Sequence, residues 1–424
     1  MPVLMTDFPF PEFRQSGGLR KPRIVLYSHD TMGLGHMRRN ILIAHALARP
    51  PIGAVVLMIA GARRATAFSL PPGTDCVTLP SLRKEKDSRY RPRRLEIELE
   101  ELIAVRSAVI RAAVSSFAPD LLVVDNVPRG AVRELDPTLE DLRSNGNTRC
   151  VLGLRDVLDE PAAVERDWTR AENEQAIRDF YDAIWVYGDR NVYDLVDEYH
   201  FPADIAAKVR YTGYLDQNVR FEFCGRQGSQ PLGRLRLPDG RLAVCVVGGG
   251  QDGADLARAF AAAEFPPLFN GVIVTGPFMA EKLQSELGEL AAGRPRLRVI
   301  EFLSEPMHLL KRADRIVAMG GYNTTCEALS LGKRTLIVPR VTPRSEQWIR
   351  ATSLEGLGLV DVLHPGAVNP GALTAWLRSN GHSPPKAREL IDLNGLARIP
   401  ELVGELLGAP LPGPRAVPEG IRIA

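Results

Sequence analysis

A chain of 424 residues is long for a single hydrophobic core, so two domains are expected. The hydrophobic content of 45%, the charged content of 25% and the formal net charge of +2 are ordinary for a soluble protein and indicate no overall attraction to nucleic acid. Five scattered cysteines without a CxxC pair indicate neither a zinc site nor a disulfide framework, and no apolar run is long enough to span a bilayer, so the cytoplasm is the expected compartment.

The first predicted element is a buried strand at residues 22–28 (PRIVLYS), which follows a loose leader at residues 1–21. The leader has no apolar segment typical of a signal peptide. The strand leads into HDTMGLGHMRRN and a helix that ends near Ala48. Gly33 and Gly35 lie where the strand turns into the helix, a place suited to close approach of a ligand.

His36 and Arg38 stand at the start of this helix, where they could meet a phosphate or a hydroxyl. A lone histidine here is more often a cap or a core residue. The presence of His29 and Asp30 in the same loop favours a functional role for His36.

Further strands are predicted at residues 54–59, 120–125, 150–154, 183–187 and 209–215, with helical stretches between several of them. Asp125 and Arg155 stand at the carboxyl ends of two of these strands, where ligands collect in open α/β sheets. Residues 83–94 (RKEKDSRYRPRR) form either a solvated loop or a lid over an acceptor. Residues 22–215 are therefore predicted to form one doubly wound acceptor domain.

A polar linker is expected at residues 216–240, and a second doubly wound domain at residues 241–395. Its strands are predicted at 242–247, 272–274, 298–300, 315–319 and 335–339, with a helix at 254–263. Asn323, Thr324 and Thr325 are residue types that begin helices, so a helix is predicted from Cys326. Residues 344–350 (RSEQWIR) are predicted as a polar loop. Residues 396–424 hold a last helix and a Pro-rich tail that could pack back on the first domain.

Glycine-rich turns at residues 33–36, 248–253 and 320–325 form the candidate site. A strand, a glycine turn and a helix N-terminus together present free N–H groups to an anion. GGGQDG lacks the Lys-Ser/Thr of a P-loop, which excludes a Walker NTPase, and it lacks the GxGxxG spacing of a dinucleotide site, which is therefore not favoured. No Asp-x-Asp occurs in the chain, and no metal or other cofactor is expected.

The motifs VVGGGQDGADL, VIEFLSEPM, GGYNTTCEALSLGKRTLIVPR and SEQWIRA resemble the donor half of MurG-type (family 28) GT-B glycosyltransferases, and GLGHMRR resembles the GxGH loop of several GT-B groups. LPSLRK, LGLRD and YTGYL extend the resemblance to a branch known only as predicted MurG-like glycosyltransferases. The resemblance implies an α/β protein of GT-B architecture, with two Rossmann-like doubly wound domains facing across a cleft.

The resemblance also implies roles for individual residues. The turn of Gly249, Gly250 and Gln251 would lie against the donor diphosphate, although MurG-type enzymes carry a serine where this chain has Gly250. Phe302 and Leu303 would border the nucleobase, and Glu327 would hold the ribose. The remaining donor positions are Gly321, Asn323, Thr324, Thr325, Glu346 and Gln347, of which Glu346 replaces a second glutamine of the family motif. His36 and Asp125 are the catalytic candidates, with Gly33, Gly35, Arg38 and Arg155 in the acceptor or cleft loops.

The implied activity is inverting, metal-independent transfer of a hexose or N-acetylhexosamine from a UDP-sugar. The acceptor would be a small molecule, a lipid-linked group or a glycan, and no nucleic acid partner is expected. A peripheral contact with the inner face of the membrane is compatible with this interpretation, and the oligomeric state is left open. Two alternatives also stay open: a nucleotide-sugar hydrolase of the pseudaminic-acid pathway type, and a non-catalytic protein that binds nucleotide sugars.

Overall fold

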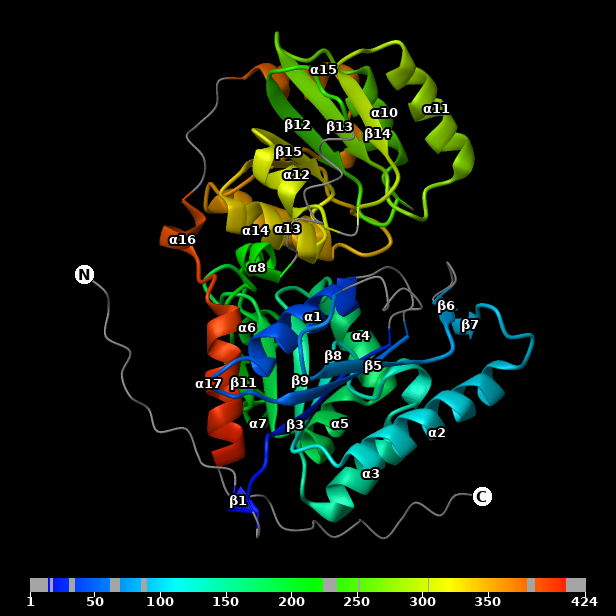
Figure 1. Ribbon diagram of the computed structural model, residues 1–424, viewed down its shortest axis with the longest axis vertical. Helices are drawn as coiled ribbons and strands as arrows, with labels where there is room; N and C mark the ends of the chain where they lie inside the picture. Colours follow the sequence, from blue (N-terminus) through cyan, green and yellow to red (C-terminus); the bar gives the residue numbers. More distant parts are fainter. Residues whose placement is uncertain are drawn as a thin grey trace.

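A computed structural model describes residues 14–15, 18–29, 35–61, 69–84, 90–223, 235–250, 252–303, 305–379 and 386–408. Two parallel β-sheets, each covered by helices, form two domains that face each other (Figure 1). The prediction of two Rossmann-like doubly wound domains is confirmed, because every strand pairing within both sheets is parallel.

The N-terminal sheet has the strand order β11-β10-β9-β8-β3-β4-β5. Its strands are β3 (Arg23–Ser28), β4 (Val55–Ala60), β5 (Thr74–Thr78), β8 (Leu121–Asp125), β9 (Arg149–Arg155), β10 (Ala183–Tyr187) and β11 (Val209–Tyr211). The helices of this half are α1 (Gly35–Ala48), α2 (Leu99–Phe117), α3 (Asp136–Asn145), α4 (Pro161–Ala171), α5 (Asn173–Phe180), α6 (Leu195–Glu198) and α7 (Ala203–Ala206). Two short hairpins, β1 (Arg14–Gln15) with β2 (Gly18–Leu19) and β6 (Leu82–Lys84) with β7 (Tyr90–Pro92), complete it.

The C-terminal sheet has the order β14-β13-β12-β15-β16-β17. Its strands are β12 (Arg241–Val246), β13 (Phe269–Val274), β14 (Leu297–Ile300), β15 (Arg315–Ala318), β16 (Arg334–Ile337) and β17 (Asp361–Val362). Its helices are α10 (Ala254–Ala262), α11 (Glu281–Ala292), α12 (Met307–Arg312), α13 (Tyr322–Leu331), α14 (Glu346–Gly356) and α15 (Pro370–Arg378).

Both faces of the N-terminal sheet are buried, because the central strands are apolar along most of their length. Ile24 and Leu26 of β3 pack toward α1, while Val25 and Tyr27 pack toward α2, α3 and α5. Helix α2 shows the matching period: Leu102, Arg106, Ile110 and Val114 are its buried residues, spaced by four.

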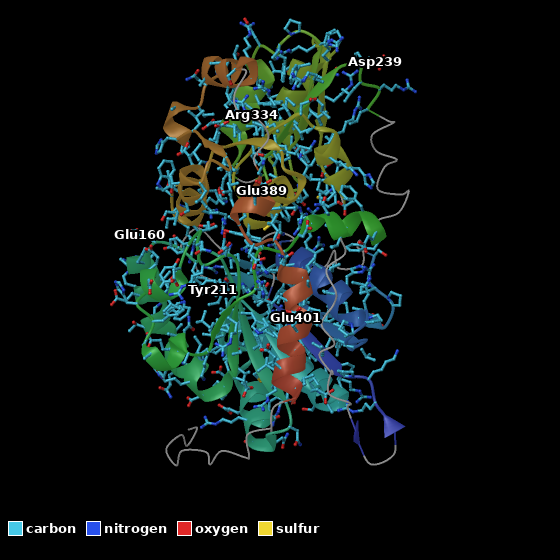
Figure 2. The ribbon with its side chains drawn as sticks, turned by 90° about the vertical axis from the view of Figure 1, so that its left-hand side faces the viewer. Glu160, Tyr211, Asp239, Arg334, Glu389 and Glu401 are labelled. Atoms are coloured by element: carbon cyan, nitrogen blue, oxygen red, sulfur yellow. The ribbon has the colours of Figure 1, made fainter. Side chains whose placement is uncertain are left out.

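The end of the described chain returns to the N-terminal domain. Helix α17 (Gly395–Gly408) packs against α1, and α16 (Ala387–Leu390) lies between the two domains in the views. Figure 2, turned by 90°, shows the helix that carries Glu401 lying along the lower domain. The hydrophobic cluster around α1 and α17 also contains Tyr322, Cys326 and Leu354 of the C-terminal domain, so the two domains share part of one core.

The structure corrects three local predictions. Residues 346–350 belong to helix α14 rather than to a loop. Helix α13 begins at Tyr322 with Gly321 as its N-cap, so Asn323 to Thr325 lie inside the helix; the turn is made earlier, at Gly320, whose φ is +76°. Within the expected linker, η3 (Gln217–Val219) and α8 (Arg220–Phe223) are helical and contact α13 and α12.

The charge-rich stretch at residues 83–94 is ordered in part as the β6–β7 hairpin, and its residues 85–89 lie outside the described residues. Most of the predicted leader, at residues 1–13 and 16–17, and the tail at residues 409–424 also lie outside them.

Candidate active site

A cleft of about 980 Å³ lies between the two domains and is lined by residues of both. Fourteen of the sequence-predicted site residues line it: Gly35, His36, Arg38, Arg155, Gly249, Gly250, Phe302, Leu303, Gly321, Asn323, Thr324, Glu327, Glu346 and Gln347. Asp125 and Thr325 are not part of the lining. Gly33 and Gln251, together with Asp30, lie outside the described residues.

His36 and Asp125 form a hydrogen-bonded pair at the N-terminal side of the cleft. His36 stands in the first turn of α1, and its Nδ1 lies 2.7 Å from Oδ2 of Asp125, the last residue of β8. Asp125 is 0% exposed and lies behind the imidazole. Asp125 does not line the cleft, so any part that it takes in catalysis would act through His36. Its role as a catalytic residue stays a prediction, and its position suits orientation of His36.

Arg39 completes this pair from one turn further along α1. A single nitrogen of its guanidinium group donates to both oxygens of Asp125, at 2.5 and 2.6 Å. Burial opposes ionisation of Asp125, but the charge of Arg39 and the hydrogen bonds from Arg39 and His36 outweigh it and hold the pKa of the carboxyl well below its usual range. Asp125 is therefore a fixed anion that accepts the Nδ1–H of His36, and Nε2 of the ring is left to act in the cleft.

The turn at residues 248–250 requires glycine. Gly250 has a φ of +92°, and a Cβ atom built on it would lie 2.3 Å from the carbonyl oxygen of Thr275. A serine at this position is excluded without a shift of the backbone. The departure from the MurG-type motif at Gly250 is therefore part of a different local geometry, in which backbone groups alone face the cleft.

Helix α13 directs its N-terminus into the cleft. The N–H of Thr325 donates the first helical hydrogen bond, to the carbonyl oxygen of Gly321. The N–H groups of Tyr322, Asn323 and Thr324 come before it and have no acceptor within the helix. Asn323 donates from Nδ2 to the carbonyl oxygen of Gly35 at 3.0 Å and so joins this helix end to α1 of the other domain. Thr325 is 2% exposed and does not line the cleft, and its buried hydroxyl has no hydrogen-bond partner among the described residues. Its contact with the donor stays a prediction.

Glu327 is held by two arginines that sequence analysis did not connect with it. Its Oε1 accepts from Arg220 at 2.5 Å and lies 3.7 Å from a nitrogen of Arg38. No hydrogen bond to Oε2 is formed by the residues that the structure describes, so this oxygen is free to accept from a ligand hydroxyl. Arg38 also donates to the carbonyl oxygen of Leu303 at 3.2 Å, across the domain boundary.

Glu346 and Gln347 stand in the first turn of α14 beside Arg340. The backbone N–H of Arg340 donates to Gln347 Oε1 at 2.9 Å, and its guanidinium group donates to Glu346 Oε1 at 2.6 Å. Oε2 of Glu346 is buried without a hydrogen-bond partner among the described residues. This oxygen lies in the cleft wall and can accept from a sugar hydroxyl.

Arg155 is the least compensated cation in the lining. It makes no hydrogen bond or ion pair with any residue that the structure describes, and its Nε has no exposed surface. Burial lowers the pKa of its guanidinium group, and the nearby charges of Arg350 and Arg39 lower it further, against the opposing effect of Glu346. An anionic ligand would relieve this cost.

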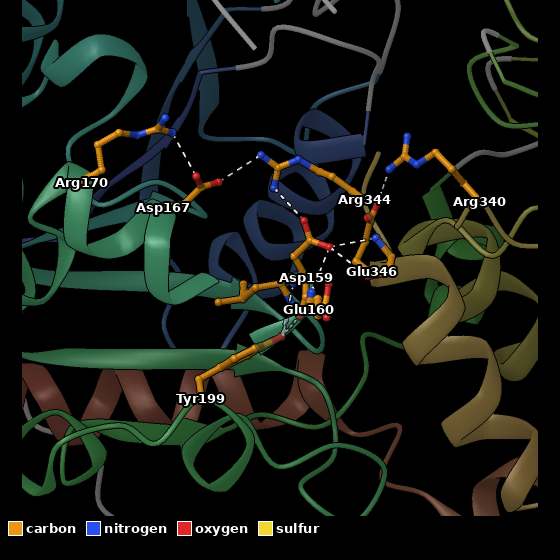
Figure 3. Close-up of polar contacts among 10 residues, drawn as sticks. Asp159, Glu160, Asp167, Arg170, Tyr199, Arg340, Arg344 and Glu346 are labelled. Atoms are coloured by element: carbon orange, nitrogen blue, oxygen red, sulfur yellow. Dashed lines mark hydrogen bonds and ion pairs between the residues drawn. The ribbon is translucent and has the colours of Figure 1, made fainter. Parts of the chain in front are cut away.

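One wall of the cleft is a chain of alternating charges between the domains (Figure 3). Arg344, just before α14, contacts Asp159 at 3.3 Å and Asp167 at 3.4 Å, and Asp167 also contacts Arg170 at 3.0 Å. The backbone N–H of Ser345 donates to Asp159 at 2.8 Å. These residues were not predicted. Arg340, by contrast, could have been predicted. Like Asp125, it lies near the carboxyl end of a strand, here β16, where ligands collect in open α/β sheets.

A buried ion pair joins the domains beneath the cleft. Nε of Arg350 lies 2.8 Å from Asp156 Oδ2, and NH2 lies 2.7 Å from Oδ1. Tyr214 donates its hydroxyl to the same carboxylate at 3.0 Å, and Arg350 also donates to the carbonyl oxygen of Gly320 at 3.1 Å. This contact therefore connects the end of β9 to the glycine turn before α13.

None of the helices in the described residues combines the length and apolar character needed to cross a membrane. The described residues also contain no group of three or more His, Cys, Asp or Glu side chains arranged to hold a metal ion.

Residues 243–379 match the model of the glycosyltransferase family 28 C-terminal domain. A curated relative is the UDP-N-acetylglucosamine--N-acetylmuramyl-(pentapeptide) pyrophosphoryl-undecaprenol N-acetylglucosamine transferase of Bacillus licheniformis, 28% identical over 175 residues. The match covers 40% of this chain and 46% of the relative, so the chain spans about half the length of that protein.

The fold is shared with solved structures over nearly the whole chain. A UDP-glucosyltransferase of Polygonum tinctorium has a TM-score of 0.64 at 15% identity, with 93% of this chain and 100% of that chain covered. MurG of Acinetobacter baumannii has a TM-score of 0.55 at 14% identity, with 91% and 99% covered. Residues 243–379 thus match the glycosyltransferase family 28 C-terminal domain, and the chain as a whole shares the GT-B fold of these solved structures.

Proposed function

We propose that this protein is a glycosyltransferase that moves a hexose or N-acetylhexosamine from a UDP-sugar to a hydroxyl acceptor. The observation that carries the proposal is the position of the His36–Asp125 pair. His36 of this pair lines the cleft from the N-terminal domain, while the Gly248–Gly250 turn and the N-terminus of α13 line it from the C-terminal domain. A base on one side and an anion site on the other are what the transfer reaction needs.

The donor would bind to the C-terminal side. The diphosphate would lie against the backbone of residues 248–250 and the N-terminus of α13, with the ribose hydroxyls on Oε2 of Glu327. Phe302 and Leu303 would border the base. The sugar would extend toward Gln347 and the unpaired oxygen of Glu346, which prefers a hydroxyl donor. The name of the curated relative supports a UDP-linked donor.

In the chemical step, the acceptor oxygen attacks the anomeric carbon from the face opposite the diphosphate. The bond between that carbon and the diphosphate oxygen breaks, its electron pair leaves with UDP, and the configuration inverts. Nε2 of His36 takes the proton of the acceptor hydroxyl, and Asp125 stabilises the imidazolium that forms. Charge grows on the diphosphate, where helix and backbone N–H groups stabilise it without a metal ion.

The acceptor is proposed to enter from the N-terminal side. The lining there combines apolar residues such as Trp168 and Val132 with arginines, and suits a molecule larger than water. A lipid-linked, glycan or small-molecule acceptor is compatible with it, and the curated relative is named for a pyrophosphoryl-undecaprenol acceptor. If the acceptor is lipid-linked, the protein would work in the cytoplasm in peripheral contact with the membrane.

A panel of nucleotide sugars tests the proposal. Each is added to the protein, and thermal unfolding is followed together with release of the nucleoside diphosphate. We expect UDP-sugars to raise the melting temperature, and an added hydroxyl acceptor to accelerate release of UDP. Release of UDP at full rate with water alone would favour the hydrolase. Stabilisation without any release, in the presence of a broad acceptor panel, would favour a binding protein.

A further inference from the structure

Arg39 occupies the floor of the cleft, where it meets the candidate base and its carboxylate partner at once. Its side chain is 2% exposed. The nitrogen that donates to both oxygens of Asp125 also lies 3.1 Å from Nδ1 of His36. Nδ1 donates its proton to Asp125 and so does not accept one from Arg39. The positive charge of Arg39 therefore lies beside the ring and opposes a second positive charge on His36.

The guanidinium group of Arg39 is enclosed by aromatic rings of both domains. It lies over the ring of Tyr187, at the end of β10, and over the ring of Tyr322, at the start of α13, with 5.4 Å to each centroid. The hydroxyl of Tyr322 donates to the carbonyl oxygen of Tyr187 at 2.8 Å and closes the enclosure. Burial disfavours the charge of Arg39, but the attraction of Asp125 outweighs it and the pKa of Arg39 lies above its usual value. The cation is therefore permanent.

Arg39 changes what the Asp125 carboxylate does to His36. A buried carboxylate beside a histidine stabilises the cationic form of the ring and so favours its protonation. A cation that shares the carboxylate removes most of this stabilisation. The other charged or titratable groups on the elements around the cluster are His29 on β3, Arg38 on α1, Arg155 and Asp156 at β9, Tyr187 on β10, Glu327 on α13, and Glu346 and Arg350 on α14.

Most of these groups compensate one another. Arg350 pairs with Asp156, and Glu327 pairs with Arg220 and lies near Arg38. Arg155 remains as a second cation, with Glu346 as its nearest opposing charge. Arg39 is thus the group in direct contact with both members of the histidine–carboxylate pair, and its removal would leave Asp125 to act on His36 alone.

We propose that Arg39 is a positioning residue that holds Asp125 in place and opposes a positive charge on His36, so that Nε2 of the ring can accept a proton. Because Tyr322 belongs to the donor domain, the proposal also makes the base dependent on contact between the domains. It rests on the proposed role of His36 as the base, and it deepens that role by naming what sets the basicity of the residue.

The test is an NMR titration of the ring nitrogens of His36 in the full-length protein, labelled with ¹⁵N in histidine. The signals are assigned with His36→Gln. Arg39→Met removes the charge, and Arg39→Gln removes it while an amide can still donate to Asp125. We expect both variants to raise the midpoint of the His36 titration by about one to two pH units, the usual effect of one close charge. Arg39→Lys keeps the charge and should shift the midpoint by much less.

Arg106→Met is the matched control. Arg106 is equally buried in the same domain and paired with Glu134, but it does not line the cleft. It should lower the melting temperature and leave the His36 midpoint unchanged. A shift in the control as large as that in Arg39→Gln, or no shift in Arg39→Gln, would overturn the proposal. Arg39→Gln also covers the case in which Arg39→Met fails to fold.

Activity separates this proposal from the proposed function. In Arg39→Gln, release of UDP should fall about tenfold for each pH unit below the raised midpoint and should recover at high pH. If the midpoint shifts but turnover does not follow it, Arg39 controls the titration of His36 and His36 is not the base. If turnover depends on His36 while the midpoint does not shift, the proposed function stands and the role of Arg39 is wrong.

Discussion

Replacing Arg350 by methionine tests the buried ion pair between the domains. Both side chains are almost inaccessible, at 1% for Arg350 and 2% for Asp156. Methionine fills much of the same volume, but it leaves the carboxylate of Asp156 with the hydroxyl of Tyr214 and without its cation. Breaking a buried pair in this way costs about 3–5 kcal/mol, because a charge stays buried without compensation.

The cost can be expressed as a melting temperature. At roughly 1 °C per kcal/mol for a chain of this size, the variant should melt about 3–6 °C below the wild type in differential scanning calorimetry. The double variant Asp156→Leu with Arg350→Met removes both charges and should recover most of the loss. Donor affinity should fall in the single variant as well, because Arg350 also bonds the carbonyl oxygen of Gly320 at the turn before α13.

Arg258→Met on α10 is the control. Arg258 pairs with Glu286 at the surface, where the two side chains are 45% and 41% exposed, so its loss should cost about 0–1 kcal/mol. The reasoning fails if Arg350→Met melts within 2 °C of this control, or if the double variant is no more stable than the single one. Either result would mean that solvent reaches Asp156 when Arg350 is removed.

Four further predictions concern the site and the pH response. His36→Ala should lower turnover by roughly 10²–10⁴ with little change in donor affinity, as measured by UDP release and calorimetry; full turnover with a lowered melting temperature would make His36 a helix cap instead. Glu327→Gln should weaken UDP binding in calorimetry about ten- to a hundredfold, since a neutral amide replaces the carboxylate that accepts the ribose hydroxyls; unchanged affinity would remove Glu327 from the donor site. EDTA should leave turnover nearly intact, and a strict requirement for added magnesium or manganese would refute the metal-free step. Burial against Phe223 and the charge of Arg49 lower the pKa of His45 to about 4. The unfolded chain therefore binds this proton first, near pH 6.5, so stability is lost as the pH falls from about 6.5 to 4; the loss is about 1–2 kcal/mol after solvent screening, and His45→Phe should remove this part of the pH dependence in urea unfolding curves.

The strands of the fold were predictable because each is a short apolar run that ends at a turn. Residues 120–125 and 183–187, for example, correspond closely to β8 and β10. Helices α3 and α11 were not identified, because they are short or polar and carry only a narrow buried face, such as Leu283 and Leu287 in α11. Helix α14 was missed for a related reason: its first turn is made of polar residues that also suit a loop.

The site was predictable where a motif carried it. His36, Glu346 and Gln347 were selected from their place after a strand or in a family motif, and the structure places them in one cleft. The partners of these residues were not predictable, because they come from distant parts of the chain. Arg220 reaches Glu327 from the expected linker, and Asp156 reaches Arg350 from the other domain. Sequence spacing carries no information about such contacts.

Helix α17 affects the order in which the protein can fold during synthesis. Ile399 and Val403 of this helix are part of the cluster that covers α1 and one face of the N-terminal sheet. The domain that leaves the ribosome first therefore lacks part of the cover of that face, beside α1, until residue 408 has been translated, after the whole C-terminal sheet. Folding of this chain is for that reason not a simple sequence from first domain to second. The nascent N-terminal half should need protection by chaperones for most of the translation time.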